Sequence, residues 1–171
     1  GYTEAGGGCG NHYKKSVIKE GDSVMQWLVK SFDTLTSQEL YEILALRSEI
    51  FIVEQNVPYQ DLDGKDLDAI HIFAKDNGTV VAAIRILKPG VSYPEASFGR
   101  VVVKESYRGK KLSSIMIQKG LELMETKWNV KQVRISAQAY LQKYYATFGF
   151  EVQSEIYIED QLPHIEMAKL H

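Results

Sequence analysis

Cysteine is almost absent from this sequence, and long apolar runs are absent altogether. Cys9 is the only cysteine among 171 residues, so the chain cannot form an intramolecular disulfide or a CxxC redox site. No apolar stretch approaches the length that spans a bilayer, and no apolar segment near the N-terminus is typical of a secretory signal. These absences favour a cytoplasmic protein, and they leave catalysis by a core cysteine thiolate without a candidate.

An excess of charge of either sign is also missing. The 20 lysines and arginines nearly balance the 22 aspartates and glutamates, which gives a net charge of −2. A protein with this balance has no general attraction to nucleic acid or to an anionic membrane. We therefore expect neither as a partner, and any anion must be bound by a local site.

Metal-ligand patterns are scarce as well. Histidine occurs only at positions 12, 71, 164 and 171, without the compact spacing of a metal site. Four aspartates lie between Asp61 and Asp68, but a calcium loop aligned on Gly64 would put Tyr59 at its first ligand position and Ile70 at its last. We expect no metal. The aspartates are interpreted as a solvated acidic loop or as a surface that attracts a cationic amine.

The first 24 residues differ in character from the rest. The glycine-rich stretch 6–10 has no apolar periodicity, and it is not a nucleotide-binding loop because no strand precedes it and no helix follows. We predict that residues 1–24 are a leader, either flexible or vector-derived, and that Met25 is a natural start. The remaining length fits one domain, over residues 25–171.

Local signals locate the secondary structure of this domain. Thr36 and Glu39 have the spacing of a capping box, and Asn77-Gly78 supplies the positive φ of a tight primed turn. Gly120 lies on the apolar side of a helix, where a missing side chain allows close approach to a sheet. Apolar periodicity predicts strands at 27–32, 69–75, 80–87, 98–103, 133–137, 151–158 and 164–170, and helices at 36–55, 112–124 and 141–148. This order predicts an α/β (α+β) fold with a mixed sheet covered by helices.

The most informative segment joins the strand 98–103 to the helix that follows it. The first amides of a helix lack intrahelical acceptors and carry the positive end of the helix dipole, so they attract an anion. Arg108, Lys110 and Lys111 add positive charges beside that end, where the dipole repels them unless an anion is bound. The charge run alone favours a solvated basic turn, and a bound pyrophosphate is the functional alternative.

The same segment resembles a known family. Strand, Arg108-Gly109-Lys110 turn and amphipathic helix are similar to the acetyl-CoA-binding core of GNAT acetyltransferases. Residues 138–150, with Tyr145 four residues before Gly149-Phe150, resemble the next motif of that superfamily. The ElaA-like branch is indicated by Leu44–Arg47, Val53–Gln55, Pro58–Asp61, Ala137–Ala139 and Pro163–Ile165. The resemblance covers nearly all of residues 26–170 and implies a mixed, mostly antiparallel central sheet flanked by helices.

One part of the motif departs from the family pattern. The pyrophosphate loop usually reads Arg/Gln-x-x-Gly-x-Gly/Ala, and this sequence has Arg108, Lys111 and Ser113 at those places. The β-carbons of Lys111 and Ser113 restrict how closely a phosphate approaches the backbone. The hydroxyls of Ser113 and Ser114 are expected to compensate in part by donating to phosphate oxygens.

The resemblance implies acetyl-CoA as the cosubstrate and assigns roles to particular residues. Backbone amides of the strand Val101–Val103 would contact the pantetheine and the thioester oxygen and would stabilise the oxyanion. Tyr145 would be the general acid toward the leaving sulfur, although its spacing alone is that of a core aromatic residue. The residues implied to bind the cosubstrate are Val101, Val102, Val103, Arg108, Gly109, Lys110, Lys111, Leu112, Ser113, Ser114, Gln138 and Tyr145.

The general base has several candidates. Glu54 lies seven residues after Arg47 on the apolar face of the predicted helix, which indicates either a buried ion pair or a group that approaches a cleft. His71 begins an apolar strand and is more typical of a structural histidine. His164 follows Pro163 near Glu159 and Asp160, whose carboxylates would raise its basicity. A water relayed by one of these groups is a further alternative.

These observations favour an N-acetyltransferase that transfers acetyl directly from acetyl-CoA to an amine of a small molecule or peptide. Two alternatives remain open at this stage. The same fold could use a different acyl donor or acceptor, as in acyl-homoserine-lactone synthases, or it could be a non-catalytic acyl-CoA-binding or regulatory module. The sequence also leaves the oligomeric state open between a monomer and a homodimer.

Overall fold

The computed structural model describes residues 16–20 and 23–171, and its strands form two sheets. The first sheet has the order β1-β2-β3-β4-β5, and every neighbouring pair is antiparallel. Its strands are β1 (Ser16–Glu20), β2 (Ser23–Ser31), β3 (Ile70–Asp76), β4 (Thr79–Leu87) and β5 (Ser97–Val103).

The second sheet has the order β6-β9-β7, with β8 also paired to β9, and its pairs are antiparallel. Its strands are β6 (Val133–Gln138), β7 (Glu151–Val152), β8 (Tyr157–Glu159) and β9 (Leu162–Lys169). A single parallel bridge between Ala96 and Val133 joins the two sheets. The mixed, mostly antiparallel architecture predicted from the sequence is therefore confirmed.

The strand β1 lies in the segment that the sequence analysis assigned to a leader. Residues 16–20 pair with β2 over five positions, from Ser16 opposite Trp27 to Glu20 opposite Ser23. Pairing with β2 satisfies backbone groups at what would otherwise be an open sheet edge. This differs from the leader predicted over residues 1–24. Residues 1–15 and 21–22 lie outside the described residues, and a domain boundary at Met25 stays a prediction.

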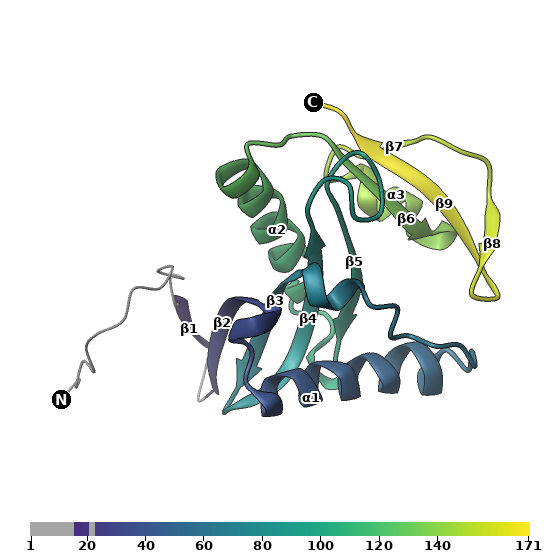
Figure 1. Cartoon of the computed structure of the whole chain (residues 1–171). Helices are drawn as coiled ribbons and strands as arrows, with labels where there is room; N and C mark the ends of the chain where they lie inside the picture. The colour runs from purple at the N-terminus through teal and green to yellow at the C-terminus, as the bar shows by residue number, and fades with distance from the viewer. Residues whose placement is uncertain (1–15, 21–22) are drawn as a thin grey trace.

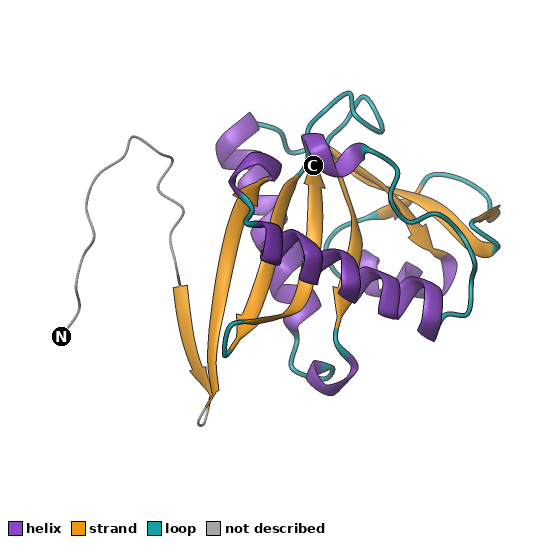
Figure 2. Ribbon diagram, turned by 60° about the horizontal axis from the view of Figure 1, so that its bottom comes forward, coloured by secondary structure: helices purple, strands orange, loops and turns teal. Residues whose placement is uncertain are grey.

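Two helical segments cover opposite faces of the first sheet. Because side chains alternate along a strand, Phe73 packs with Ile43 and Leu46 of α1 (Ser37–Arg47), whereas Ile72 packs with Met116 of α2 (Leu112–Trp128). All five of these side chains are buried, and each contributes about 1.5–3 kcal/mol of hydrophobic stabilisation. In Figure 2 the segment that begins with α1 lies in front of the strands.

The close approach predicted at Gly120 is confirmed. A β-carbon placed there would lie 2.6 Å from Cδ1 of Ile86 in β4. Only a residue without a side chain lets α2 come this near to the sheet. The position of α2 matters for the site because its N-terminus adjoins the end of β5.

The predicted capping box begins α1. The Glu39 amide donates to Oγ1 of Thr36 at 3.1 Å, and the Thr36 amide donates to Oε1 of Glu39 at 2.9 Å. The predicted helix runs on past Arg47, but residues Ser48–Glu54 form a π-helix. In a π-helix the amide bonds to the fifth preceding carbonyl, so side chains beyond Arg47 no longer follow the spacing of an α-helix.

The last helix is shorter than predicted. A 3₁₀ turn over Ala139–Leu141 leads into α3 (Gln142–Ala146), and the chain leaves the helix through Gly149 at a φ of 92°. The two sheets separate beyond the Ala96–Val133 bridge (Figure 1), with α3 beside the second sheet. Within residues 16–20 and 23–171, no helix is long and apolar enough to cross a bilayer.

Candidate functional site

A cleft of about 650 Å³ opens where β5 and β6 separate. Each of these strands ends its own sheet, so each presents an edge that has no strand partner beyond the Ala96–Val133 bridge. The wall opposite β6 is formed by β5 and by the loop that precedes β3, and the β8–β9 hairpin closes one end. The predicted site residues that line the cleft are Val101, Val103, Arg108, Ser113, Gln138, Tyr145 and His164.

The backbone of β5 faces this cleft at alternate residues. The Lys104 amide donates to the Val81 carbonyl of β4 at 2.8 Å, so the amide of Val103 points away from β4. The same alternation turns the Val101 amide toward the cleft. Val102 differs from its two neighbours, because its backbone pairs with β4 and its side chain is buried against α1. It does not line the cleft, and this placement gives no support to its predicted contact with the cosubstrate.

A second cavity, of about 390 Å³, adjoins the first at the N-terminus of α2. The first intrahelical hydrogen bond runs from the Ile115 amide to the Lys111 carbonyl, so the three amides before Ile115 have no acceptor within the helix. No side chain caps this end, and the first turn has no acidic residue. Free amides at the positive end of a helix dipole suit a phosphate group. Seven predicted residues line this cavity: Val103, Arg108, Gly109, Lys111, Leu112, Ser113 and Ser114.

Lys111 has a backbone conformation that favours glycine. It precedes the first residue of α2 with a φ of 62°. The left-handed region costs an L-residue about 1–2 kcal/mol, whereas glycine adopts it freely. The loop thus keeps a left-handed geometry at this point with lysine in place of glycine, and part of the folding free energy is lost to backbone strain.

We therefore expect Lys111→Gly to stabilise the fold by about 0.5–1 kcal/mol, because glycine relieves the strain but has a more flexible unfolded state. The matched control is Lys110→Gly, which removes the same charge from the neighbouring residue, where φ is not positive. The free energy of unfolding in urea measures both. A Lys111→Gly variant that is no more stable than Lys110→Gly would contradict the strain.

Lys110 and Ser113 have partners within the protein. Lys110 lines neither cavity, and its Nζ lies 5.1 Å from the centroid of the Tyr107 ring, so its contact with the cosubstrate stays a prediction. Oγ of Ser113 lies 2.6 Å from the hydroxyl of Tyr144. The hydroxyl predicted to reach a phosphate is therefore held at the boundary between the two cavities.

Glu54 contacts Arg108, not Arg47. The Arg108 guanidinium donates to the two carboxylate oxygens of Glu54 at 2.5 and 2.8 Å, and both side chains are about two-fifths exposed. These hydrogen bonds lower the pKa of Glu54, which makes the carboxylate a weaker base. Glu54 also does not line the cleft. Its predicted role as general base has no support from this geometry.

The π-helix explains why the expected pairing on one helix face is wrong. Seven residues are two turns of an α-helix but fewer than two turns of a π-helix, so Glu54 leaves the face that carries Arg47. Arg47 is 1% exposed and donates to Asp61 at 2.8 Å and to Asp66 at 2.7 Å. Arg47 therefore does form a buried ion pair, but its partners are Asp61 and Asp66 and not Glu54.

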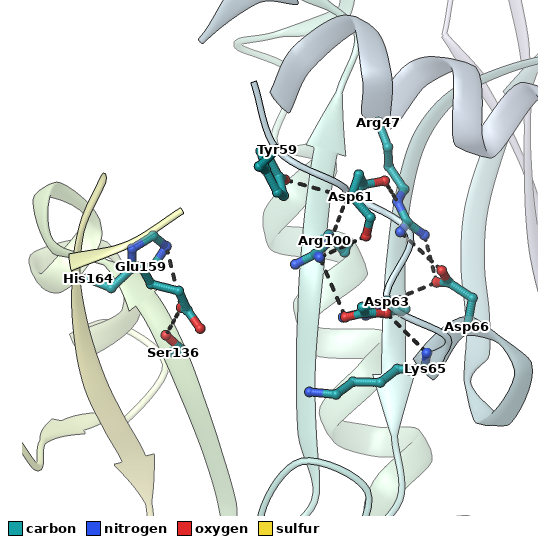
Figure 3. A network of polar contacts seen from close by, with 11 residues as sticks. Arg47, Tyr59, Asp61, Asp63, Lys65, Asp66, Arg100, Ser136, Glu159 and His164 are labelled. Carbon is teal, nitrogen blue, oxygen red and sulfur yellow. Dashed lines mark hydrogen bonds and ion pairs between the residues drawn. The ribbon is translucent and has the colours of Figure 1, made fainter. Parts of the chain in front are cut away.

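Three of the four aspartates before β3 are paired with arginines, whereas Asp68 is exposed. Asp61 and Asp66 are buried and bind Arg47, while Asp63 receives two hydrogen bonds from Arg85, at 2.6 and 2.7 Å. Burial alone would raise the pKa of Asp66, but the hydrogen bonds from Arg47 and the positive charges of Arg47 and Arg85 together outweigh it, and the net shift is downward. Figure 3 shows most of this network on one wall of the site.

His71 belongs to the same buried network and not to the cleft. Its ring is 2% exposed, and Nε2 lies 3.0 Å from the Asp66 carbonyl. Burial lowers its pKa, so the ring stays neutral, but it does not line the cleft and has no path to a substrate. Its predicted place among the catalytic candidates is corrected to a structural one.

Tyr145 lies on the cleft wall formed by α3. It is 7% exposed and packs against the rings of Phe98 and Phe150. Burial raises the pKa of its hydroxyl well above the usual range, so the hydroxyl remains a proton donor. Within the part of the chain that the structure describes, the tyrosine hydroxyls with hydrogen bonds are those of Tyr59, Tyr107, Tyr144 and Tyr157. The Tyr145 hydroxyl is therefore available to a ligand.

His164 lies in β9 of the second sheet, where it pairs with Gln138 of β6. Its Nδ1 is 2.8 Å from the Leu162 carbonyl. A carbonyl can only accept, so Nδ1 carries the hydrogen and Nε2 of the neutral ring keeps its lone pair. Nε2 is 3.8 Å from Oε2 of Glu159, as Figure 3 shows at the left. A proton taken up by Nε2 would face this carboxylate.

Glu159 is itself held by side chains that the sequence analysis did not identify. Ser136 donates to Oε2 of Glu159 at 2.7 Å, and its Oγ is 2.5 Å from the hydroxyl of Tyr157. Since the single hydrogen of Ser136 goes to the carboxylate, Tyr157 donates to Ser136. Only the strand alternation at Ser136 was visible in the sequence, and it gave no signal of this contact.

Metal-ligating side chains do not gather in this cleft. No group of three or more histidine, cysteine, aspartate or glutamate side chains in the described part of the chain is arranged to hold a metal ion. The polar groups that line the cleft include backbone amides, a tyrosine hydroxyl and an imidazole, and these three kinds of group are suited to group transfer with proton movement.

Known proteins share this architecture and sequence. Residues 33–171 match the acetyltransferase (GNAT) domain. Protein ElaA of Escherichia coli is 42% identical over 148 residues, which cover 85% of this chain and 97% of ElaA. Its crystal structure has a TM-score of 0.76 and covers 84% of this chain and 98% of that one.

A crystal structure described as an acyl-CoA N-acyltransferase from Pseudomonas aeruginosa is also similar. It has a TM-score of 0.81 and 40% sequence identity, over 85% of this chain and 99% of that chain. The resemblance inferred from the motifs, including the ElaA-like branch, is confirmed by these matches.

Proposed function

The chain belongs to the GNAT acetyltransferase family, and we propose that it transfers an acetyl group from acetyl-CoA directly to the amine of a small molecule or peptide. The observation that carries this proposal is the junction of β5 and α2. There the uncapped N-terminus of a helix and the open edge of a strand face two adjoining cavities. The similar Pseudomonas protein, described as an acyl-CoA N-acyltransferase, supports an acyl-CoA donor.

The α2 end of the site fits the diphosphate of coenzyme A. The free amides of Leu112, Ser113 and Ser114 offer donors without a competing carboxylate, and the helix dipole favours an anion there. Arg108 would add a charge-assisted contact. Its present bond to Glu54 is exposed, and such pairs are worth only about 0–1 kcal/mol, so a diphosphate can replace it.

The open edge of β5 fits the other end of the cosubstrate. The amides of Val101 and Val103 point into the cleft, where they would donate to the extended pantetheine and to the thioester oxygen. Amides fixed by a strand do not reorganise as charge develops on that oxygen, and this is why such donors stabilise an oxyanion. The amine attacks the thioester carbon, the carbon–sulfur bond breaks, and two proton transfers complete the reaction.

Tyr145 is proposed to supply the proton to the leaving sulfur. Its hydroxyl is not committed to a protein acceptor, and burial keeps it protonated. It borders the same cleft as the Val101 and Val103 edge. A hydroxyl held in an apolar wall of this kind can donate to a developing thiolate without competition from water.

His164 is proposed as the base that accepts the proton from the amine. It is the one candidate from the sequence analysis that lines the cleft and has a free lone pair, at Nε2. When Nε2 takes up the proton, the positive imidazolium faces the Glu159 carboxylate at 3.8 Å. Glu159 thus stabilises the charged ring, and the hydrogen bond from Ser136 holds the carboxylate in place.

The release of free thiol from acetyl-CoA by the purified protein, in the presence of a panel of amines, tests this function. We expect release that depends on both acetyl-CoA and one class of amine, with the acetylated amine as the second product. Binding of coenzyme A without turnover on a broad panel would favour a binding module. Turnover with a longer acyl-CoA and none with acetyl-CoA would contradict the proposed donor.

A further inference from the structure

Arg100 has a strained backbone at the centre of the cleft wall. Its φ is 52°, in the left-handed region that costs an L-residue about 1–2 kcal/mol. The pairing of β5 with β4 shifts register at the same point, so that Arg100 and Val101 lie opposite the single residue Ile84. This is a β-bulge, a feature that redirects the strand that contains it.

The side chain of Arg100 donates two hydrogen bonds to Asp61. Its Nε donates to Oδ1 of Asp61 at 2.6 Å, and its Nη2 donates to the Asp61 carbonyl at 2.9 Å (Figure 3). Asp61 is 5% exposed and is itself bound by Arg47, which is 1% exposed. The contact therefore ties the bulge to a buried charge network that belongs to α1 and to the loop before β3.

Strained residues persist where the surroundings hold them, and they gather at functional sites. We propose that Asp61, through its two hydrogen bonds with Arg100, holds the β5 bulge in its left-handed conformation. This contact thereby fixes the direction in which the Val101 and Val103 amides face the cleft. The inference rests on the proposed function, in which these amides stabilise the oxyanion. Arg100 and Asp61 are positioning residues, because they act through the backbone of β5.

The geometry separates this role from direct substrate binding by the guanidinium. Two nitrogens of Arg100 are committed to Asp61, and Nη2 also lies 3.5 Å from Oδ2 of Asp63. If the guanidinium bound the acceptor, any replacement of Arg100 would remove that contact equally. If Arg100 acts through its backbone, glycine and alanine at this position differ, because only glycine adopts a positive φ without strain.

The experiment therefore compares kcat and the KM for acetyl-CoA of Arg100→Gly and Arg100→Ala. We expect alanine to lower kcat about 5- to 30-fold, the factor that corresponds to 1–2 kcal/mol of strain without the contact that offsets it. Glycine is expected to lower kcat only about threefold. If the Arg100→Ala variant does not fold, the Arg100→Asn variant is compared with Arg100→Gly in its place. Asparagine tolerates the left-handed region, so it should resemble glycine.

Asp61→Asn in both backgrounds tests whether Asp61 acts through Arg100. With Arg100 present, we expect this change to lower kcat about fivefold, because a neutral amide oxygen accepts a hydrogen bond from Arg100 Nε that is weaker by about 1 kcal/mol than the one to the carboxylate, while the bond to the backbone carbonyl remains. In the Arg100→Gly background it should change kcat less than about twofold, because the bulge no longer needs the contact. Equal effects in the two backgrounds would overturn the proposal, since independent residues give additive free energies.

Asn129 supplies the matched control for backbone strain. It has the same φ of 52° at the C-terminal end of α2 and lines neither cavity. Asn129→Ala should lower the free energy of unfolding about as much as Arg100→Ala but leave kcat unchanged. Equal kcat for Arg100→Gly and Arg100→Ala would overturn the inference while the unchanged protein still turns over. A complete lack of turnover in the unchanged protein would instead reject the proposed function.

Discussion

Tyr145→Phe is expected to lower kcat by about 10²- to 10⁴-fold, the usual contribution of a positioned general acid. The hydroxyl is the only group removed, and no described residue depends on it for a hydrogen bond. The ring contacts with Phe98 and Phe150 remain, so the fold should keep its stability. Steady-state kinetics and a coenzyme A titration measure the two effects, and affinity for coenzyme A should be unchanged.

Tyr144→Phe is the matched comparison for this change. The Tyr144 hydroxyl lies 2.6 Å from Oγ of Ser113 at the start of α2, so its loss should act on the binding of acetyl-CoA. We expect a higher KM and a kcat close to that of the unchanged protein. A Tyr145→Phe enzyme that keeps full kcat would remove Tyr145 from the mechanism and leave it a core aromatic residue.

His164→Asn is expected to lower kcat/KM by a factor in the same range, about 10²- to 10⁴-fold. Asparagine can place its amide nitrogen near the position of Nδ1 and donate to the Leu162 carbonyl as the imidazole does. It has no group at the position of Nε2, so the base is removed while the hydrogen bond that orients the side chain is retained. The free energy of unfolding should therefore change little.

The pH–rate profile separates a base from a structural residue at this position. The neutral imidazole is the active form, so kcat/KM of the unchanged protein should fall as acid protonates the ring. This limb should be missing from the profile of His164→Asn. A profile that is identical with and without His164 would exclude it as the base.

Local sequence signals predicted the elements whose geometry depends on residues close to them in the sequence. The Thr36–Glu39 capping box, the Asn77-Gly78 turn with φ values of 49° and 82°, and the close contact at Gly120 were all predicted. Each follows from a few residues and the steric properties of the backbone. The alternation of Val133, Ile135 and Ala137 likewise appears as burial along β6.

Features set by distant contacts could not be predicted in this way. The π-helix after Arg47 moves Glu54 off the expected face, and nothing in the seven residues Ser48–Glu54 marks it. Arg100 has a positive φ, and the partner of its side chain, Asp61, lies 39 residues away in the sequence. From the sequence alone, Asp63 and Asp66 were interpreted as part of a solvated or amine-attracting loop. Their arginine partners could not be identified in this way, because they lie on other elements of the fold.

In the candidate site, too, the features set by residues near in sequence were predicted and those set by distant contacts were not. One motif predicted the edge of β5 and the start of α2, whose residues are contiguous in the sequence, and a second motif over residues 138–150 predicted Tyr145. Val102 and Lys110 line neither cavity, because a motif predicts a segment and not the direction of each side chain. The hydrogen bond from Ser136 to Glu159 joins β6 to the β8–β9 hairpin, and only the fold brings these two side chains together.

The proposed function depends most on the junction of β5 and α2 as a site for the diphosphate and pantetheine of coenzyme A. Calorimetric titration of the purified protein tests this directly, with coenzyme A in one run and pantetheine, which lacks the diphosphate, in another. We expect coenzyme A to bind with a dissociation constant below about 1 mM, corresponding to −4.1 kcal/mol, and pantetheine to bind at least about 10-fold more weakly because it makes no contact with the free amides of α2. The absence of heat from coenzyme A at millimolar concentration would contradict the account.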